Sequence, residues 1–196
     1  MTRKTSITRD DILSMDDYAR IRAAKRRDLR PIKIRRRVAV GPYATFYFEN
    51  YETMWHQVHE MLFIERGGEE QIADELEAYN PLIPQGRDLA ATVMFEIDDP
   101  VRRKTFLSKL GGVEETMTLE FEGHTVSSVA EEDVDRTTAD GKASSVQFVH
   151  FPMTDEQAAL FKRPDTRVAL GITHPAYPHL TILPEEVREE LARDLD

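Results

Sequence analysis

Apolar and polar residues alternate in several short runs of the chain, a pattern typical of strands with one buried face. Residues 43–49 and 89–97 alternate in this way, whereas residues 145–151 carry apolar side chains on both faces and should form a central strand. The same criterion predicts further strands over residues 32–41, 117–121, 124–129, 166–173 and 180–183.

In other stretches apolar residues recur every three or four positions, which predicts helices. Hydroxyl or acidic residues mark their starts, and paired glycines mark several of their ends. The predicted helices cover residues 15–29, 50–65, 69–79, 98–111, 154–162 and 184–195. Pro31 should end the first of these near Arg30, because proline disfavours the helical conformation in the residue before it.

The predicted helices and strands are interspersed without regular alternation, and short turns join several of the strands. This order indicates an α+β fold, with a mainly antiparallel sheet packed by several helices. A length of 196 residues suggests one domain. Residues 131–142 are acidic and rich in Asp and Thr, so we expect a solvent loop there, and the most mobile segment of the chain.

Charge is distributed very unevenly along the chain. Residues 1–37 contain 13 Lys and Arg and 5 Asp, a net charge of +8. The whole chain has 26 basic and 36 acidic residues, so the remainder holds 13 basic and 31 acidic ones, a net charge of −18. The sequence therefore divides into a basic N-terminal helical arm, residues 1–37, and a single acidic α+β domain, residues 38–196.

Composition excludes several classes of function. The chain has no cysteine, which excludes disulfides, thiolate nucleophiles and cysteine-ligated metal clusters. No apolar run approaches the roughly 20 residues that span a bilayer. The N-terminus also lacks the apolar segment of a signal peptide. We therefore expect a cytoplasmic protein without a membrane partner.

The basic arm is the strongest candidate for binding a partner. We expect it to dock an acidic protein surface, or a second copy of the chain in a homodimer. The residues expected to make this contact are Arg26, Arg27, Arg30, Arg35, Arg36 and Arg37. RNA bound through residues 20–37 is an alternative, but no aromatic residues for base stacking lie there, and the acidic body would repel a polyanion. A solvated helix surface is the third interpretation.

Several polar residues fall near apolar positions, where a charge is costly unless it is paired. Arg36 lies on the apolar side of its predicted strand and needs a carboxylate or phosphate partner. Similarly placed are Glu60, Glu65, Asn80 and Glu96. We expect these residues to pair with Arg36 and Arg102 in a buried network. The alternative is a small polar pocket between the sheet and two helices, lined by Glu60 and Asn80.

His56, His59 and Glu60 share one face of a predicted helix and could converge on a divalent metal ion, as in a metal-assisted enzyme or sensor. Their order differs from the HExxH pattern of zinc proteases, and surface histidines are the alternative. No other cofactor is predicted. A second group, His150, His174 and His179, includes histidines beside prolines in a turn, where a structural role is the more common one.

Catalytic signatures are absent from the sequence. It contains no Gly-x-Ser-x-Gly motif, and Gly67-Gly68 and Gly111-Gly112 fit helix ends better than a phosphate-binding loop. We therefore expect an accessory or binding protein rather than an enzyme.

Segments spread along the chain are similar to one known family. The matching residues are Arg36–Val38, Val40, Gly41, Phe48, Glu49, Thr53, Gln57, Glu60, Met61, Glu65, Glu75, Leu76, Tyr79–Pro84, Leu89–Thr92, Glu96, Arg102 and Ser144–Phe151. Over nearly its whole length the chain resembles the bacterial domain-of-unknown-function family 3501. The resemblance implies a small cytoplasmic protein without assigned activity, often encoded near rubrerythrin-like and heterodisulfide-reductase-like proteins. It therefore implies a redox or oxidative-stress setting for an accessory protein.

Overall fold

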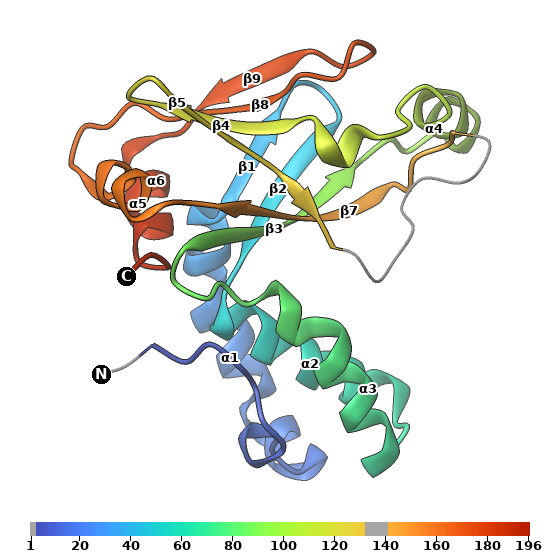
Figure 1. The fold of residues 1–196 in the computed structure, drawn as a ribbon. Coiled ribbons are helices and arrows are strands. Elements are labelled where there is room, and N and C mark those ends of the chain that lie inside the picture. Colours follow the sequence, from blue (N-terminus) through green and yellow to red (C-terminus); the bar gives the residue numbers. More distant parts are fainter. Residues whose placement is uncertain (1–2, 132–140) are drawn as a thin grey trace.

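The computed structural model describes residues 3–131 and 141–196, and within them two antiparallel sheets are flanked by helices (Figure 1). The predicted α+β class is confirmed. The five-stranded sheet has the order β1 (Arg37–Val40), β2 (Ala44–Glu49), β3 (Asp88–Phe95), β7 (Val146–Pro152) and β6 (Val129–Ala130). The four-stranded sheet has the order β5 (His124–Ser127), β4 (Met117–Phe121), β8 (Ala169–Ile172) and β9 (His179–Ile182).

The main core lies between the two sheets. Phe46 and Phe48 of β2 and Phe151 of β7 form its aromatic part, and Leu119 and Leu170 meet them from the four-stranded sheet. The predicted central position of the strand near residue 148 is confirmed, because β7 pairs with both β3 and β6. Two helices complete this core with apolar side chains, α5 (Asp155–Lys162) and α6 (Glu185–Ala192).

The other face of the five-stranded sheet meets a layer of three helices, α1 (Met15–Arg35), α2 (Tyr51–Glu65) and α3 (Glu69–Tyr79) (Figure 1). The Asn50 side chain caps α2 by accepting a hydrogen bond from the Thr53 amide, as expected for this residue at a helix start. Shorter helical elements are α4 (Pro100–Leu107) and the 3-10 turns Arg9–Asp11, Asn80–Leu82 and Val113–Glu115.

The prediction that Pro31 ends the first helix is wrong, since α1 continues through it to Arg35. A proline inside a helix leaves the carbonyl four residues earlier without its amide partner. Here that carbonyl belongs to Arg27, and because both residues are exposed, water can solvate it. The predicted strand over residues 32–41 is correspondingly reduced to β1, and Ile34 is 63% exposed instead of facing the core.

Two other boundaries differ from the sequence-based prediction. Residues 124–129 form no single strand: β5 belongs to the four-stranded sheet and β6 to the five-stranded sheet. The chain crosses between them at Ser128, whose hydroxyl donates to the Glu114 carbonyl at 2.6 Å and so fixes the crossover. Helix α4 ends at Leu107, earlier than the predicted end at Gly111. Most of the predicted solvent loop, residues 132–140, lies outside the described residues.

The basic N-terminal segment packs closely against the rest of the fold. Tyr18 of α1 is fully buried between Trp55, His59 and Phe63 of α2. Ahead of α1, the Ile7 backbone exchanges two hydrogen bonds with the Asn80 side chain, at 2.7 and 2.9 Å. Within the described residues, no helix is both long and apolar enough to cross a bilayer.

Candidate functional site

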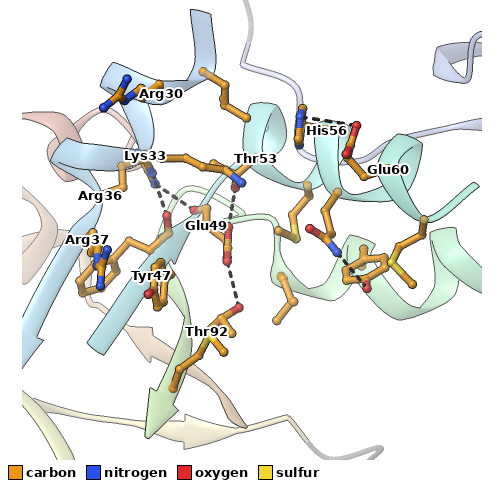
Figure 2. A pocket seen from close by; sticks show the side chains of 18 of the residues that line it. Arg30, Lys33, Arg36, Arg37, Tyr47, Glu49, Thr53, His56, Glu60 and Thr92 are labelled. Carbon is orange, nitrogen blue, oxygen red and sulfur yellow. Dashed lines mark hydrogen bonds and ion pairs between the residues drawn. The ribbon is translucent and has the colours of Figure 1, made fainter. Parts of the chain in front are cut away.

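A cleft of about 890 Å³ opens between the helical layer and the outer face of the five-stranded sheet (Figure 2). Its volume lies within the roughly 300–1,000 Å³ typical of small-molecule sites. The sheet supplies Tyr47, Glu49, Thr92, Met94, Val146 and Phe148. The helices α1 and α2 supply both apolar side chains and most of the charged ones. This is the candidate site, because its polar groups converge from elements far apart in sequence.

Glu49 lies near the centre of the cleft, at the end of β2 (Figure 2). One carboxylate oxygen accepts a hydrogen bond from the Thr53 hydroxyl at 2.6 Å, and the other accepts one from the Thr92 hydroxyl at 2.9 Å. Burial raises the pKa of Glu49, and the nearby charges of Lys33 and Arg36 oppose this rise. The carboxylate is thus held rigidly by neutral donors, and each oxygen keeps a lone pair for another group.

His56 of α2 lines the same cleft and is 9% exposed. Neither of its ring nitrogens has a hydrogen-bond partner in the described residues. The nearest acidic atom, Oε1 of Glu60, is 4.0 Å from Nε2. Burial lowers the pKa of His56, so the ring is neutral at pH 7 and offers one donor and one acceptor. A buried polar group without a partner costs about 1–3 kcal/mol, and a hydrogen-bonding molecule in the cleft would remove this cost.

The side of the cleft formed by α1 is strongly basic. Arg26, Arg30 and Lys33 recur at helical spacing along it, are exposed, and form no ion pair within the described residues. Figure 2 shows the Lys33 side chain extending toward Thr53 and Glu49. Two exposed apolar residues also line the cleft: Ile34 is 63% exposed and Ile64 is 64% exposed.

Glu60 is paired with two residues of α1. The Arg22 guanidinium donates to both carboxylate oxygens at 2.7 and 2.8 Å, and the Tyr18 hydroxyl donates at 2.7 Å. The Arg22 hydrogen bonds lower the pKa of Glu60 to about 2. Glu60 therefore borders the cleft as half of an ion pair that fastens α1 to α2.

The geometry does not gather His56, His59 and Glu60 into a metal site. His59 is fully buried and both its ring nitrogens are used: Nδ1 bonds the Trp55 carbonyl at 2.7 Å, and Nε2 accepts from the Leu13 amide at 3.1 Å. Glu60 is engaged by Arg22. In residues 3–131 and 141–196, no three His, Asp or Glu side chains are grouped so as to hold a metal ion.

The other predicted polar residues lie apart from one another. Asn80 bonds the Ile7 backbone and does not line the cleft. Glu96 accepts from the Thr45 hydroxyl at 2.6 Å and lies 3.7 Å from Arg37. Glu65 is exposed and accepts from Gln71, and Arg102 donates to the Tyr43 hydroxyl at 3.3 Å. The expected common network of these residues with Arg36 and Arg102 is therefore wrong.

Arg36 has carboxylate partners, as the sequence required, but they come from the C-terminal segment. It is 2% exposed and forms an ion pair with Asp194, with Glu190 3.4 Å away. Its guanidinium also donates to the Phe48 and Glu49 carbonyls at 3.0 and 2.9 Å. Arg36 therefore joins the end of α1 to β2 and to the residues after α6, and its burial prevents contact with a partner.

The second group of histidines is divided between different parts of the fold. His150, on β7, lies between two carboxylates, with Nδ1 3.1 Å from Asp88 and Nε2 2.9 Å from Glu131. His174 accepts from the Ala176 amide, and the His179 ring packs against Tyr177. Within the described residues, His150 is the only one of the three with charged partners.

The Asp88 and Glu131 hydrogen bonds raise the pKa of His150 above its usual value. A raised folded-state pKa stabilises the protein fully below the unfolded-state pKa of about 6.5, and this contribution is lost as pH rises through the folded-state pKa. We therefore expect the loss of stability in His150→Gln to be largest near pH 6 and smaller near pH 9, as measured by thermal unfolding. His174→Gln is the control, and an equal loss at both pH values in His150→Gln would contradict the assignment.

Three residues of the cleft were not selected by chemical reasoning from the sequence. Glu49, Thr53 and Thr92 occur among the residues that carry the family resemblance, but no spacing rule connects a strand end, a helix start and a second strand. They meet only because β2 pairs with β3 and runs directly into α2.

Comparison with known proteins agrees with the fold and the resemblance. The family model described as "Protein of unknown function (DUF3501)" matches residues 6–195. A solved structure, that of a novel protein of unknown function from Burkholderia pseudomallei K96243, matches with a TM-score of 0.90 and 34% sequence identity, covering 97% of this chain and 100% of that one. No curated protein matches the chain. The chain belongs to the DUF3501 family of proteins of unknown function.

Proposed function

We propose that this protein is a binding protein that docks an acidic protein surface through the exposed cations of α1. We call Arg26, Arg27, Arg30, Lys33 and Arg35 the α1 basic face; all five are exposed. The observation that carries the proposal is that Arg26, Arg30 and Lys33 have no carboxylate within ion-pair distance in the described residues. Uncompensated positive charge of this kind attracts an acidic surface locally and favours it over a basic or neutral one.

A second copy of the chain supplies a surface of the required chemistry. Helix α3 exposes Glu70, Asp74 and Glu77, which share one side of the helix with spacings of four and three residues. Arg26, Arg30 and Lys33 have the same spacings on α1. If the two helices run parallel, these equal spacings place each cation opposite one acidic residue of the partner helix. Self-association through α1 of one copy and α3 of another is therefore the form of docking that we propose.

Two of the six arginines that the sequence suggested for partner binding, Arg36 and Arg37, do not belong to this surface. Arg36 is buried in its ion pair with Asp194. Arg37 lies 3.7 Å from Glu96 and packs over the Tyr47 ring, so its charge is already compensated within the chain.

The test is a charge exchange between the two helices. We expect the wild-type protein to self-associate at about 0.05 M salt and to dissociate at about 1 M salt, where charges are screened beyond a few ångströms. Replacing Arg26, Arg30 and Lys33 by Glu should weaken association by more than about tenfold, because like charges then face each other. Light scattering coupled to size exclusion measures the oligomeric state.

Reversing the charges on α3 as well distinguishes a specific pairing of the two helices from a general loss of charge. Glu70→Lys, Asp74→Lys and Glu77→Lys, combined with Arg26→Glu, Arg30→Glu and Lys33→Glu, should restore association. A matched control places the same three Lys substitutions in the wild-type background, where association should fall. A wild-type protein that remains monomeric at low salt would refute docking to a second copy.

RNA is the rival occupant of the α1 basic face. Binding of a single-stranded homopolymer, steeply weakened by salt and insensitive to base identity, would favour RNA. No observation in the described residues favours a metal-assisted function, since His59 and Glu60 already have partners.

A further inference from the structure

The cleft has the chemistry of a binding site for a small molecule, separate from the docking of a protein. Its volume of about 890 Å³ exceeds what a few waters need, and its walls combine aliphatic, thioether and aromatic side chains. Met54, Met61 and Leu29 line the side formed by the helices. Met94 and Phe148 line the side formed by the sheet. An apolar molecule bound between these walls would bury surface on both sides at once.

The charges around the cleft select the sign of the ligand. Of the lining residues, five are cationic and two are acidic. Glu60 is neutralised by its ion pair with Arg22. Burial raises the pKa of Glu49, which favours its uncharged acid, and two threonine hydroxyls hydrogen-bond to it. Arg30 and Lys33 have no ion-pair partner in the described part of the chain. An anion is therefore favoured, because it would compensate free cations, whereas a cation would face them.

The unpaired ring nitrogens of His56 are the observation that points to a bound ligand in the cleft. It is 9% exposed, lines the cleft, and leaves both ring nitrogens without partners in the described residues. Figure 2 shows it on the same side of the cleft as Glu60, above the Glu49 carboxylate. A polar atom of a bound molecule would remove the cost of leaving these nitrogens unpaired.

We propose that this cleft binds a small amphipathic organic anion. Its acid group lies between Arg30 and Lys33, and a polar atom of the molecule hydrogen-bonds to His56. Its apolar body lies between Met54 and Met61 on one side and Met94 and Phe148 on the other. The proposal does not require self-association, because a single copy of the chain supplies the whole cleft. Arg30 and Lys33 also belong to the α1 basic face, so the anion and the α3 helix of a second copy would compete for them.

The test compares ligands that share one apolar chain and differ in the head group. Isothermal titration calorimetry is carried out with decanoate, decyl phosphate and decyltrimethylammonium, below the concentrations at which each forms micelles. We expect one or both anions to bind at least about tenfold more tightly than the cation. The stronger of the two anions assigns the acid group as a carboxylate or a phosphate. Equal binding of all three compounds, or binding of none, would overturn the proposal.

Two pairs of substitutions separate the site from general electrostatic attraction. Arg30→Gln with Lys33→Gln removes two cations of the cleft, whereas Arg27→Gln with Arg35→Gln removes two exposed cations of the same helix outside it. We expect the first pair to weaken anion binding by about tenfold or more and the second pair to leave it nearly unchanged. An equal loss in both pairs would show non-specific attraction and refute the site.

His56→Leu provides a readout that a structural histidine would not give. Because the ring nitrogens have no partners to lose within the described residues, we expect an unchanged or higher melting temperature without ligand. The shift in melting temperature caused by the tighter-binding anion should fall by at least half. A variant that is less stable yet keeps the full shift would assign His56 a structural role only, and would remove it from the proposal.

Discussion

Replacing Arg36 by Met should destabilise the protein by about 3–5 kcal/mol, as expected when one partner of a buried ion pair is removed. The substitution leaves Asp194 in a buried position without its cation, and removes the donors to the Phe48 and Glu49 carbonyls. Chemical denaturation in urea, followed by tryptophan fluorescence, measures the loss. Trp55 is suitable as the reporter because it lies in the helical layer, packed against Tyr18 and His59.

The control for this prediction is the neighbouring residue. Arg35 is exposed, so Arg35→Met should change the free energy of unfolding by no more than about 0.5 kcal/mol. Combining Arg36→Met with Asp194→Leu should recover part of the loss, because no buried carboxylate is then left without a cation. A loss below about 1 kcal/mol in Arg36→Met would contradict the importance of this ion pair.

Replacing Glu60 by Gln should cost about 2–3 kcal/mol at neutral pH, and the cost should disappear in acid. The pKa of Glu60 is lowered to about 2 by Arg22, from an unperturbed value of 4.5. A lowered pKa means that the ion pair contributes its full stability above about pH 4.5 and loses it as pH falls toward 2. One pKa unit corresponds to about 1.4 kcal/mol, so the lowered pKa of Glu60 gives an upper bound on the cost. Because the Arg22 side chain is partly exposed, water weakens the ion pair and the expected cost is below that bound.

Urea denaturation at neutral pH and near pH 3 measures this change. The difference between wild type and Glu60→Gln should be clearly smaller at the lower pH. Glu52→Gln, on the same helix, is the matched control, because Glu52 lies 4.0 Å from Lys25 and both side chains are about half exposed. A difference of equal size at both pH values would mean that Tyr18 and packing, and not the charge on Glu60, are responsible.

Local signals in the sequence were sufficient for most helices and strands. The caps of α2 and α5 and the alternation in β3 predict their elements closely, because hydrogen bonds within a few residues determine them. Where the prediction of α1 is wrong, tertiary contacts are the cause. Leu29 and Arg36 are buried seven residues apart, two helical turns, and this spacing outweighs the local effect of Pro31.

The candidate site was much less predictable than the fold. That Arg36 and Glu60 require partners follows from burial alone, but their partners Asp194 and Arg22 are 158 and 38 positions away. The sequence gives no reason to prefer these partners over others of the same charge. Likewise, the ring nitrogens of His56 have no hydrogen-bond partner in the described residues, and the periodicity of the sequence carries no information about such a missing partner. The histidine pattern instead suggested a metal ion.

The ion pair between Arg36 and Asp194 also limits the order in which the chain can fold. At a synthesis rate of about 5–20 residues per second, roughly 8–30 seconds separate the appearance of these two residues. Until Asp194 has been made, an Arg36 packed in its native position would be a buried cation without a counterion, which is unfavourable. The junction of α1, β1 and β2 can therefore reach its native packing only after Asp194 has been synthesised. The segment after α6 then completes the fold by packing against this junction.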